Sequence, residues 1–75
     1  MVFCKLTELD ESRSGIIRSI ENEGYSLKLL EMGIIPGEKV TMDINKKKGS
    51  PLKIHIGGAF ISLRWEEADC IVVEC

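Results

Sequence analysis

A segment near the middle of the sequence, LLEMGIIPGEKV at 29–40, most constrains the fold because it changes from a helical pattern to a turn within a few residues. Gly33 sits where the chain turns left-handed after the last helical turn, a conformation that a Cβ atom opposes by about 1 kcal/mol or more. Pro36 supplies the fixed φ for the first corner of a type II turn, and Gly37 supplies the positive φ of the second. The segment therefore predicts a helix, a glycine stop and a turn that begins a strand.

The residues before this stop predict a helix of about two turns. Ser26 is a residue type that caps helix N-termini, and Leu27, Leu30 and Ile34 follow it at helical spacing. We expect Leu27 and Leu30 to face the core.

Strands are predicted on both sides of this helix, at residues 15–20, 39–45, 52–56, 59–63 and 70–73. Alternation in the second strand places Ile44 in the core, and Phe60 in the fourth is also assigned to the core. Gly57 and Gly58 fit a two-residue hairpin turn, and residues 64–68 fit a single helical turn. The pattern predicts a mainly β fold, a small barrel of about five strands with a short α-helix inserted between the first and second long strands.

Length and composition place the chain among small globular proteins. Its 75 residues have room for a single domain, 1–75, and 44% hydrophobic residues are enough to build one core. No apolar run approaches the roughly 20 residues that cross a bilayer, and the start lacks the long apolar segment of a signal peptide. We therefore expect a cytoplasmic protein.

The net charge of −2 argues against a nucleic-acid partner, because such proteins carry a surplus of Lys and Arg that neutralises phosphates. The one basic run, Lys46, Lys47 and Lys48, adjoins Gly49-Ser50-Pro51 and predicts a hairpin tip. Two interpretations of the run stay open: a solvated loop, or a contact with an acidic partner or an anionic membrane surface.

The order of short motifs along the chain resembles that of one family, the FeoA proteins of bacterial ferrous-iron transport. The matching motifs are Leu6-x-x-Leu9, Gly15-Ile16-Ile17, Leu30-x-Met32-Gly33-Ile34-x-Pro36-Gly37, Pro51-Leu52-Lys53-Ile54 and Gly58-x-x-x-Ser62-Leu63-Arg64-x-x-x-Ala68-x-x-Ile71-x-Val73. One position departs from the family, which usually has a glycine in the opening loop where this chain has Ser12 or Arg13. The conformation of that loop is left open.

The resemblance implies an SH3-like β-barrel with a non-enzymatic, accessory or regulatory role and no cofactor. The implied partner is the cytosolic GTPase region of a ferrous-iron transporter of the FeoB type, so the protein would meet the membrane only through this partner. The same barrel resembles the C-terminal domain of iron-dependent repressors, and a stand-alone domain of that kind is an alternative. Neither the oligomeric state nor the sign of the effect on transport follows from the resemblance.

Several residues are candidates for the partner-binding surface. Leu29 and Met32 lie about 60 to 100° around the helix axis from the predicted core face, so they are expected to be partly exposed. The alternative is that both seal the end of the barrel. Arg64 and Trp65 join the lysine run as further candidates, with Trp65 either a lid on the core or an exposed anchor. The following pair, Glu66 and Glu67, is interpreted as a solvated face.

A metal-binding or metal-sensing protein is the alternative from a different functional class. His55 is the only histidine, and alternation places it on the outer face of its strand. A non-haem iron site usually needs two histidines and a carboxylate, so no metal site is predicted. Cys4 and Cys75 lie near chain ends that meet in many small barrels, which leaves an adventitious thiolate site open with His55 as a further candidate ligand.

Overall fold

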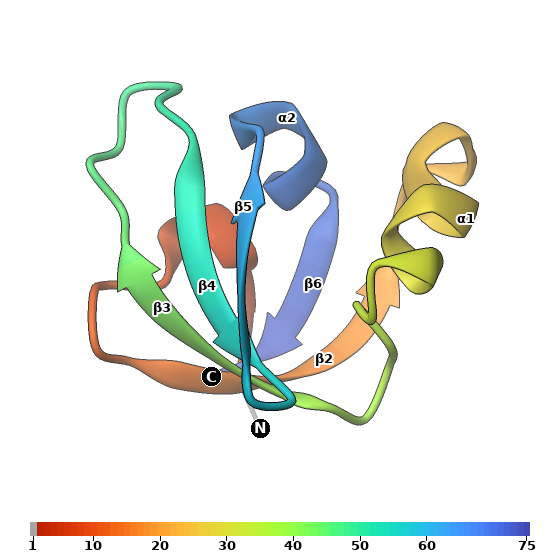
Figure 1. Cartoon of the computed structure of the whole chain (residues 1–75), viewed down its shortest axis with the longest axis horizontal. Helices are drawn as coiled ribbons and strands as arrows, with labels where there is room; N and C mark the ends of the chain where they lie inside the picture. The colour runs from red at the N-terminus through yellow and green to blue at the C-terminus, as the bar shows by residue number, and fades with distance from the viewer. Residues whose placement is uncertain (1) are drawn as a thin grey trace.

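Six antiparallel strands form one curved sheet in the computed structural model, which describes residues 2–75 (Figure 1). The strands are β1 (Phe3–Lys5), β2 (Ser14–Ile20), β3 (Lys39–Ile44), β4 (Leu52–Ile56), β5 (Ala59–Leu63) and β6 (Ile71–Glu74). Their order in the sheet is β1-β6-β2-β3-β4-β5. The helical elements are the 3₁₀ helix η1 (Leu6–Glu8), α1 (Glu23–Glu31) and α2 (Trp65–Ala68). The predicted mainly β architecture is confirmed, with α1 between the first two long strands.

The prediction of about five strands was one short, because β1 is also a strand. This three-residue strand pairs with β6, and Cys4 lies opposite Val73 in the ladder. Three residues are too few to show an alternating pattern, so β1 exists through its pairing rather than through its own sequence. The two ends of the described chain consequently lie close together, as Figure 1 shows.

The core lies inside the curve of the sheet and is closed by residues from the helical elements. Its buried apolar side chains are Leu6, Leu9, Ile17, Leu29, Ile34, Val40, Met42, Leu52, Ile54, Ile56, Leu63, Ala68, Ile71 and Val73. The predicted alternation is confirmed most clearly in β4, where three apolar residues are buried while Lys53 and His55 point outward. Burying an aliphatic side chain stabilises a fold by roughly 1.5–3 kcal/mol, so this cluster makes the main favourable contribution to the free energy of folding.

The predicted glycine corners are confirmed. Gly33 has a φ of +93° directly after the last turn of α1, and Gly37 has a φ of +97°. The turn around Pro36 and Gly37 is closed by the Glu38 N–H, which donates to Ile35 O at 3.0 Å. Gly57 and Gly58 both have positive φ between β4 and β5, as a two-residue hairpin of the I′ class requires.

Two apolar residues assigned to the core are exposed instead. The ladder between β3 and β4 shifts register between Met42 and Ile44, so Ile44 turns outward and Asn45 becomes buried. A bulge of this kind reverses the faces of all residues beyond it. Phe60 is 61% exposed because alternation in β5 directs Ile61 and Leu63 inward and Phe60 to the opposite face.

The buried Asn45 ties the lysine loop to the loop that follows η1. Its Nδ2 donates to the backbone oxygens of Thr7 at 3.0 Å and of Leu9 at 2.9 Å, and its Oδ1 accepts from the Lys47 N–H at 3.0 Å. A buried amide with all of these partners carries little desolvation penalty. The bulge therefore exchanges an apolar contact for a hydrogen-bonded connection between two loops.

The loop before β2 contains Ser12 in the left-handed conformation, with a φ of +72°. Its N–H donates to Met42 O at 2.8 Å, and the neighbouring Arg13 N–H donates to Asp10 O at 3.0 Å. These bonds hold the turn in place although a Cβ atom opposes it by about 1–2 kcal/mol. This is the loop where the sequence departs from the family pattern, and the serine there adopts a backbone conformation that glycine would take without strain.

We predict that Ser12→Gly raises the free energy of unfolding by about 0.5–1 kcal/mol, since the relief of left-handed strain exceeds the entropy that glycine loses on folding. The measurement is urea denaturation followed by Trp65 fluorescence. The matched control is Ser62→Gly, at an exposed position of β5 with ordinary φ, which should lose about 0.5–1 kcal/mol. A loss of stability in Ser12→Gly would contradict the strain assigned to this residue.

Candidate interaction site

The rotation of α1 about its axis differs from the prediction. Asn22 caps the helix by accepting a hydrogen bond from the Gly24 N–H at 2.8 Å, so the helix begins four residues before the start that a Ser26 cap implies. Leu29 is completely buried, whereas Leu27 is 68% and Leu30 41% exposed. The prediction that Leu27 and Leu30 face the core and Leu29 is partly exposed is therefore wrong.

A stripe of three residues explains this rotation. Tyr25, Leu29 and Met32 follow one another at spacings of four and three, which places them on one face of a helix. Leu29 belongs to the core, and Tyr25 and Met32 pack against it half-buried. The spacing of these three residues can be seen in the sequence. A helix that begins at a Ser26 cap leaves Tyr25 outside, so the predicted helix does not show this face. Leu29 is accordingly not available to a partner, and Met32 only in part.

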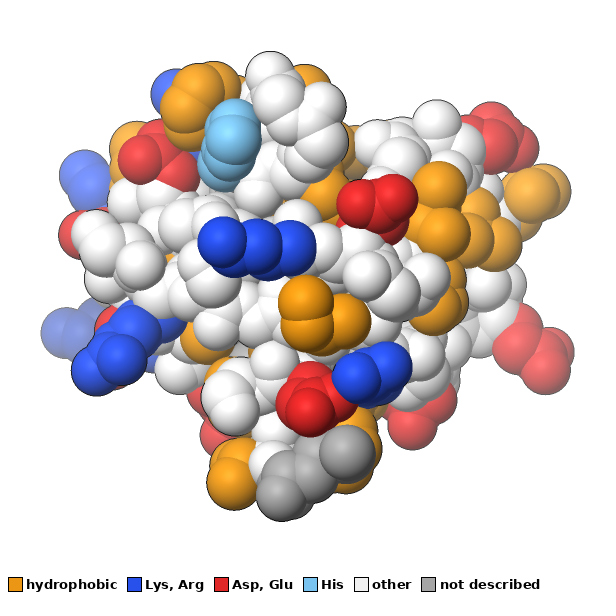
Figure 2. Space-filling model, turned by 90° about the horizontal axis from the view of Figure 1, so that it is seen from below, with side chains coloured by type: hydrophobic (Ala, Val, Ile, Leu, Met, Phe, Trp, Pro, Cys, Tyr) orange, Lys and Arg blue, Asp and Glu red, His pale blue; other side chains and the backbone are white. Residues whose placement is uncertain are grey.

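The opposite face of α1 is an exposed apolar surface. Leu27 and Leu30 are neighbours at a spacing of three, and Ile35, in the segment after the helix, is 45% exposed. We call these three residues the α1 face. Figure 2 shows hydrophobic side chains gathered on the side of the molecule where Figure 1 places α1, with acidic side chains around them. Large apolar side chains that are exposed together in so small a protein are typical of binding surfaces.

Exposed acidic residues lie on α1 and in the segments that adjoin it in the chain, a stretch that also holds Lys28 and Lys39. The exposed members are Glu21, Glu23, Glu31 and Glu38. None of them takes part in the five ion pairs found within residues 2–75. Their charges are consequently free to act on the surroundings rather than being neutralised inside the protein.

Glu67 fixes α1 to α2 and is not the solvated residue that the sequence predicted. Its side chain is 4% exposed, and its Oε2 accepts from Lys28 Nζ at 2.5 Å. Its Oε1 accepts from the backbone N–H of Arg64 at 2.9 Å, which caps the short helix α2. These two bonds, with that of Lys28 first, hold the pKa of the Glu67 carboxyl below its usual range. Only Glu66 of the predicted acidic pair is exposed.

The lysine loop is confirmed as the connection between β3 and β4, but it lies away from the α1 face. Figure 1 shows this loop and α1 on opposite sides of the molecule, with α2 between them. Lys46 and Lys48 are exposed, whereas Lys47 Nζ donates to Thr7 O at 3.3 Å and lies 3.5 Å from Asp10 Oδ1. The structure therefore does not join the predicted apolar and basic candidates into one surface.

The remaining candidates lie at the start of α2 and on β4. Arg64 is exposed, and Trp65 is half-buried against the core, as the lid interpretation requires. His55 is exposed, as predicted, and stacks beside Phe60 with ring centroids 4.8 Å apart, while Lys53 Nζ lies 5.0 Å from the Phe60 ring centre. Within residues 2–75, no three His, Cys, Asp or Glu side chains gather in a group that could hold a metal ion.

A family model described as FeoA domain matches residues 4–75. The chain belongs to the FeoA domain family. No curated protein matches its sequence. The FeoA family is associated with ferrous-iron transport.

Solved structures confirm the SH3-like fold of this FeoA domain. Iron(II) transport protein A from Clostridium thermocellum is 36% identical with a TM-score of 0.82, over 95% of this chain and 44% of that chain. FeoA from Stenotrophomonas maltophilia, solved with zinc and described as a procaryotic SH3 domain protein, is 30% identical with a TM-score of 0.82, over 95% and 89% of the two chains. The IdeR protein of T. acidophilum shares the fold at 21% identity and a TM-score of 0.85, over 99% of this chain and 34% of that longer chain.

No helix in the described part of this FeoA domain is long and apolar enough to cross a membrane.

We predict that Glu67→Gln lowers the free energy of unfolding at pH 7 by about 1–3 kcal/mol, because it removes the charge from a buried carboxylate that two donors hold. The folded-state pKa of Glu67 is depressed, so its contribution is present above the unfolded pKa of about 4.3 and is lost as the pH falls through the folded pKa. The variant should therefore lose less stability than the wild type on acidification below about pH 5. Urea denaturation between pH 3 and 7 measures both effects.

The control for this substitution is Glu66→Gln, which changes the exposed neighbour on the same short helix. It should alter stability by less than about 0.5 kcal/mol at every pH. Equal effects of the two substitutions would contradict a specific role for the contact between Glu67 and Lys28.

Proposed function

We propose that this protein is a cytoplasmic, non-enzymatic accessory protein of ferrous-iron uptake that binds the cytosolic GTPase region of a FeoB-type transporter. Membership of the FeoA domain family supports the link to ferrous-iron transport. The S. maltophilia relative is itself described as possibly acting as a bacterial ferrous iron transport activating factor. The chain meets the membrane only through its partner in this proposal.

The single observation that carries the proposal is the exposure of the α1 face. Leu27 and Leu30 turn away from the core while Leu29, between them, is buried, so the helix presents one apolar face to each side. A helix of this kind binds by laying its outer face in an apolar groove, with anchors at a spacing of three or four residues. The α1 face supplies two such anchors and Ile35 follows them in the chain.

The charges around the α1 face indicate the character of the groove. Because exposed acidic side chains lie on α1 and beside it in the chain, a partner with an apolar groove bordered by Lys or Arg would be both attracted and oriented. Burial of the two leucines would supply most of the affinity, and the acidic side chains would act on the association rate. Binding can influence transport only if the protein has a higher affinity for one state of the transporter than for another.

The two alternative functions have less support than this one. A metal sensor would need a ligand set, and the candidate His55 already contacts Phe60 on the outer face of the sheet. The repressor-like alternative rests on IdeR, whose similarity at 21% identity extends to the fold alone. Neither alternative explains why α1 exposes two leucines.

We predict that the double substitution Leu27→Ser and Leu30→Ser weakens binding to the isolated GTPase region at least tenfold, since it removes both apolar anchors. Titration calorimetry measures the affinity, and a thermal melt should show little change because neither side chain belongs to the core. The matched control is Phe60→Ser, which removes an equally exposed apolar group from a different face and should bind normally. Unchanged affinity of the double variant would exclude the α1 face.

Stopped-flow measurement of association, together with the same titration, distinguishes this surface from the lysine loop. Glu23→Gln with Glu31→Gln should slow association at low salt, because both charges lie on the helix that bears the face. Lys46→Gln with Lys48→Gln should leave binding unchanged in this proposal. Loss of binding in the lysine variant alone would move the contact surface to the opposite side of the molecule.

A further inference from the structure

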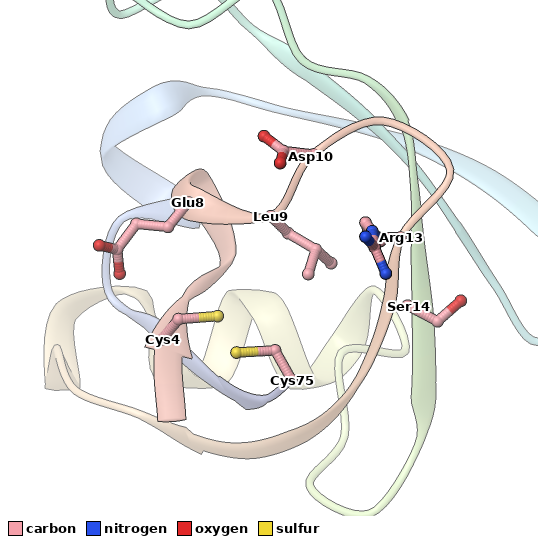
Figure 3. Close-up of a pocket in the computed structure, with 7 residues that line it drawn as sticks. All are labelled: Cys4, Glu8, Leu9, Asp10, Arg13, Ser14 and Cys75. Atoms are coloured by element: carbon pink, nitrogen blue, oxygen red, sulfur yellow. The ribbon is translucent and has the colours of Figure 1, made fainter. Parts of the chain in front are cut away.

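Two of the three cysteines come together at the meeting point of the chain ends. Cys4 lies on β1 opposite Val73, and the Cys75 N–H donates to Val2 O at 3.0 Å, which continues the ladder by one more bond. Cys75 is two residues beyond Val73, so its side chain and that of Cys4 are diagonal neighbours on one face of the sheet. Figure 3 shows the two sulfur atoms pointing toward each other.

The two thiols line a cavity of about 340 Å³ that opens to solvent. Its walls are formed by Cys4, Glu8, Leu9, Asp10, Arg13, Ser14 and Cys75. Cys75 is exposed and Cys4 is half-buried behind it, so a small reagent reaches Cys75 first. Thiol exchange requires that the oxidant reach the sulfur, and the cavity gives that access from solvent.

The surroundings assign different roles to the two cysteines. The pKa of the Cys4 thiol is raised to about 12, first by burial and then by the hydrogen bond and charge of the Cys75 side chain, with a smaller contribution from Glu8. Cys4 therefore stays protonated at neutral pH, while the exposed Cys75 is the thiol that reacts first. Cys70 does not line the cavity, and its Sγ donates to Glu67 O at 3.0 Å.

We infer that Cys4 and Cys75 form a redox-active thiol pair that a small disulfide, such as oxidised glutathione, converts to a disulfide joining β1 to the end of β6. The Cys75 thiolate attacks one sulfur of the oxidant, forms a mixed disulfide and releases one glutathione thiolate. In the mixed disulfide Cys75 carries no thiolate charge that opposes ionisation of Cys4; the Cys4 thiol loses its proton, its thiolate attacks the Cys75 sulfur, and the second glutathione leaves as a thiolate that takes up a proton. Two protein thiols are oxidised to one disulfide, and one glutathione disulfide is reduced to two thiols.

Disulfide formation suits this pair better than metal binding does. A closed soft-metal site usually uses three or four ligands, and the described residues provide no group of three ligating side chains here. Disulfide formation needs only the two sulfur atoms, but diagonal neighbours lie about 7–8 Å apart, so the two strand ends must draw together to form the bond. β1 can make that adjustment because it is an edge strand that pairs only with β6.

The disulfide would close nearly the whole described chain into one loop. A cross-link over so long a loop strongly restricts the unfolded chain and so stabilises the folded one. Because β1 and β6 are already paired, the native state loses little by the cross-link. We expect the melting temperature to rise by about 10 °C or more on oxidation.

The test uses the full chain with Cys70→Ser, so that only the proposed pair remains. The reduced protein is equilibrated in buffers of increasing ratio of oxidised to reduced glutathione, alkylated, and analysed by intact mass and peptide mapping. The expected product has lost two hydrogens, carries neither alkyl group nor glutathione, and links Cys4 to Cys75. Its melting temperature should exceed that of the reduced form by about 10 °C, and dithiothreitol should reverse the change.

A variant that lacks Cys4 as well as Cys70 provides the control. With Cys4→Ser added, Cys75 should stop at a stable glutathione adduct, because no second thiol remains to displace it. A stable adduct on Cys75 in the presence of Cys4 would overturn the inference, and so would a disulfide that forms only in urea. An oxidised form that melts below the reduced form would also overturn it, since the bond would then not fit the native ladder.

Discussion

The burial of Leu29 is the contact on which the position of α1 depends. A nine-residue helix is too short to be stable alone in water, so its stability comes from the face that it packs against the sheet. Leu29 is the only fully buried side chain of the helix, and Gly33 releases the chain from the helix directly afterwards. The bond between Lys28 and Glu67 then fixes the rotation from outside. Both contacts together force Leu27 and Leu30 outward.

Much of the fold could be predicted because several local signals agreed with one another. In β4 the alternation of apolar and polar residues, the glycine pair after it and the cross-strand partner all lead to the same register. The left-handed positions of Gly33 and Gly37 followed from residue type alone. Signals of this kind are local, so no knowledge of the tertiary structure was needed to interpret them.

The errors arose where a single tertiary contact decided between two local possibilities. Asn22 and Ser26 are both good helix caps, and a start at Ser26 excludes Tyr25 and hides the face on which Leu29 packs against the core. The bulge after Met42 turned Ile44 outward because Asn45 found buried backbone partners. Glu67 is buried because Lys28, 39 positions earlier, reaches it. The backbone partners of Asn45 and the lysine partner of Glu67 lie outside the sequence window that local patterns use, whereas the choice between the two helix caps is a local one.

The α1 face and the cavity that holds Cys4 and Cys75 lie at different parts of the sheet. Figure 1 places the chain ends away from α1, and the link between them runs from β1 through β6 and β2. The rotation of α1 is set by Leu29 and by Glu67, neither of which lies on the wall of the cysteine cavity. A cross-link between β1 and β6 adds stability to strands that are already paired, without altering either of those contacts. Oxidation should therefore raise the free energy of unfolding without changing the structure of the α1 face.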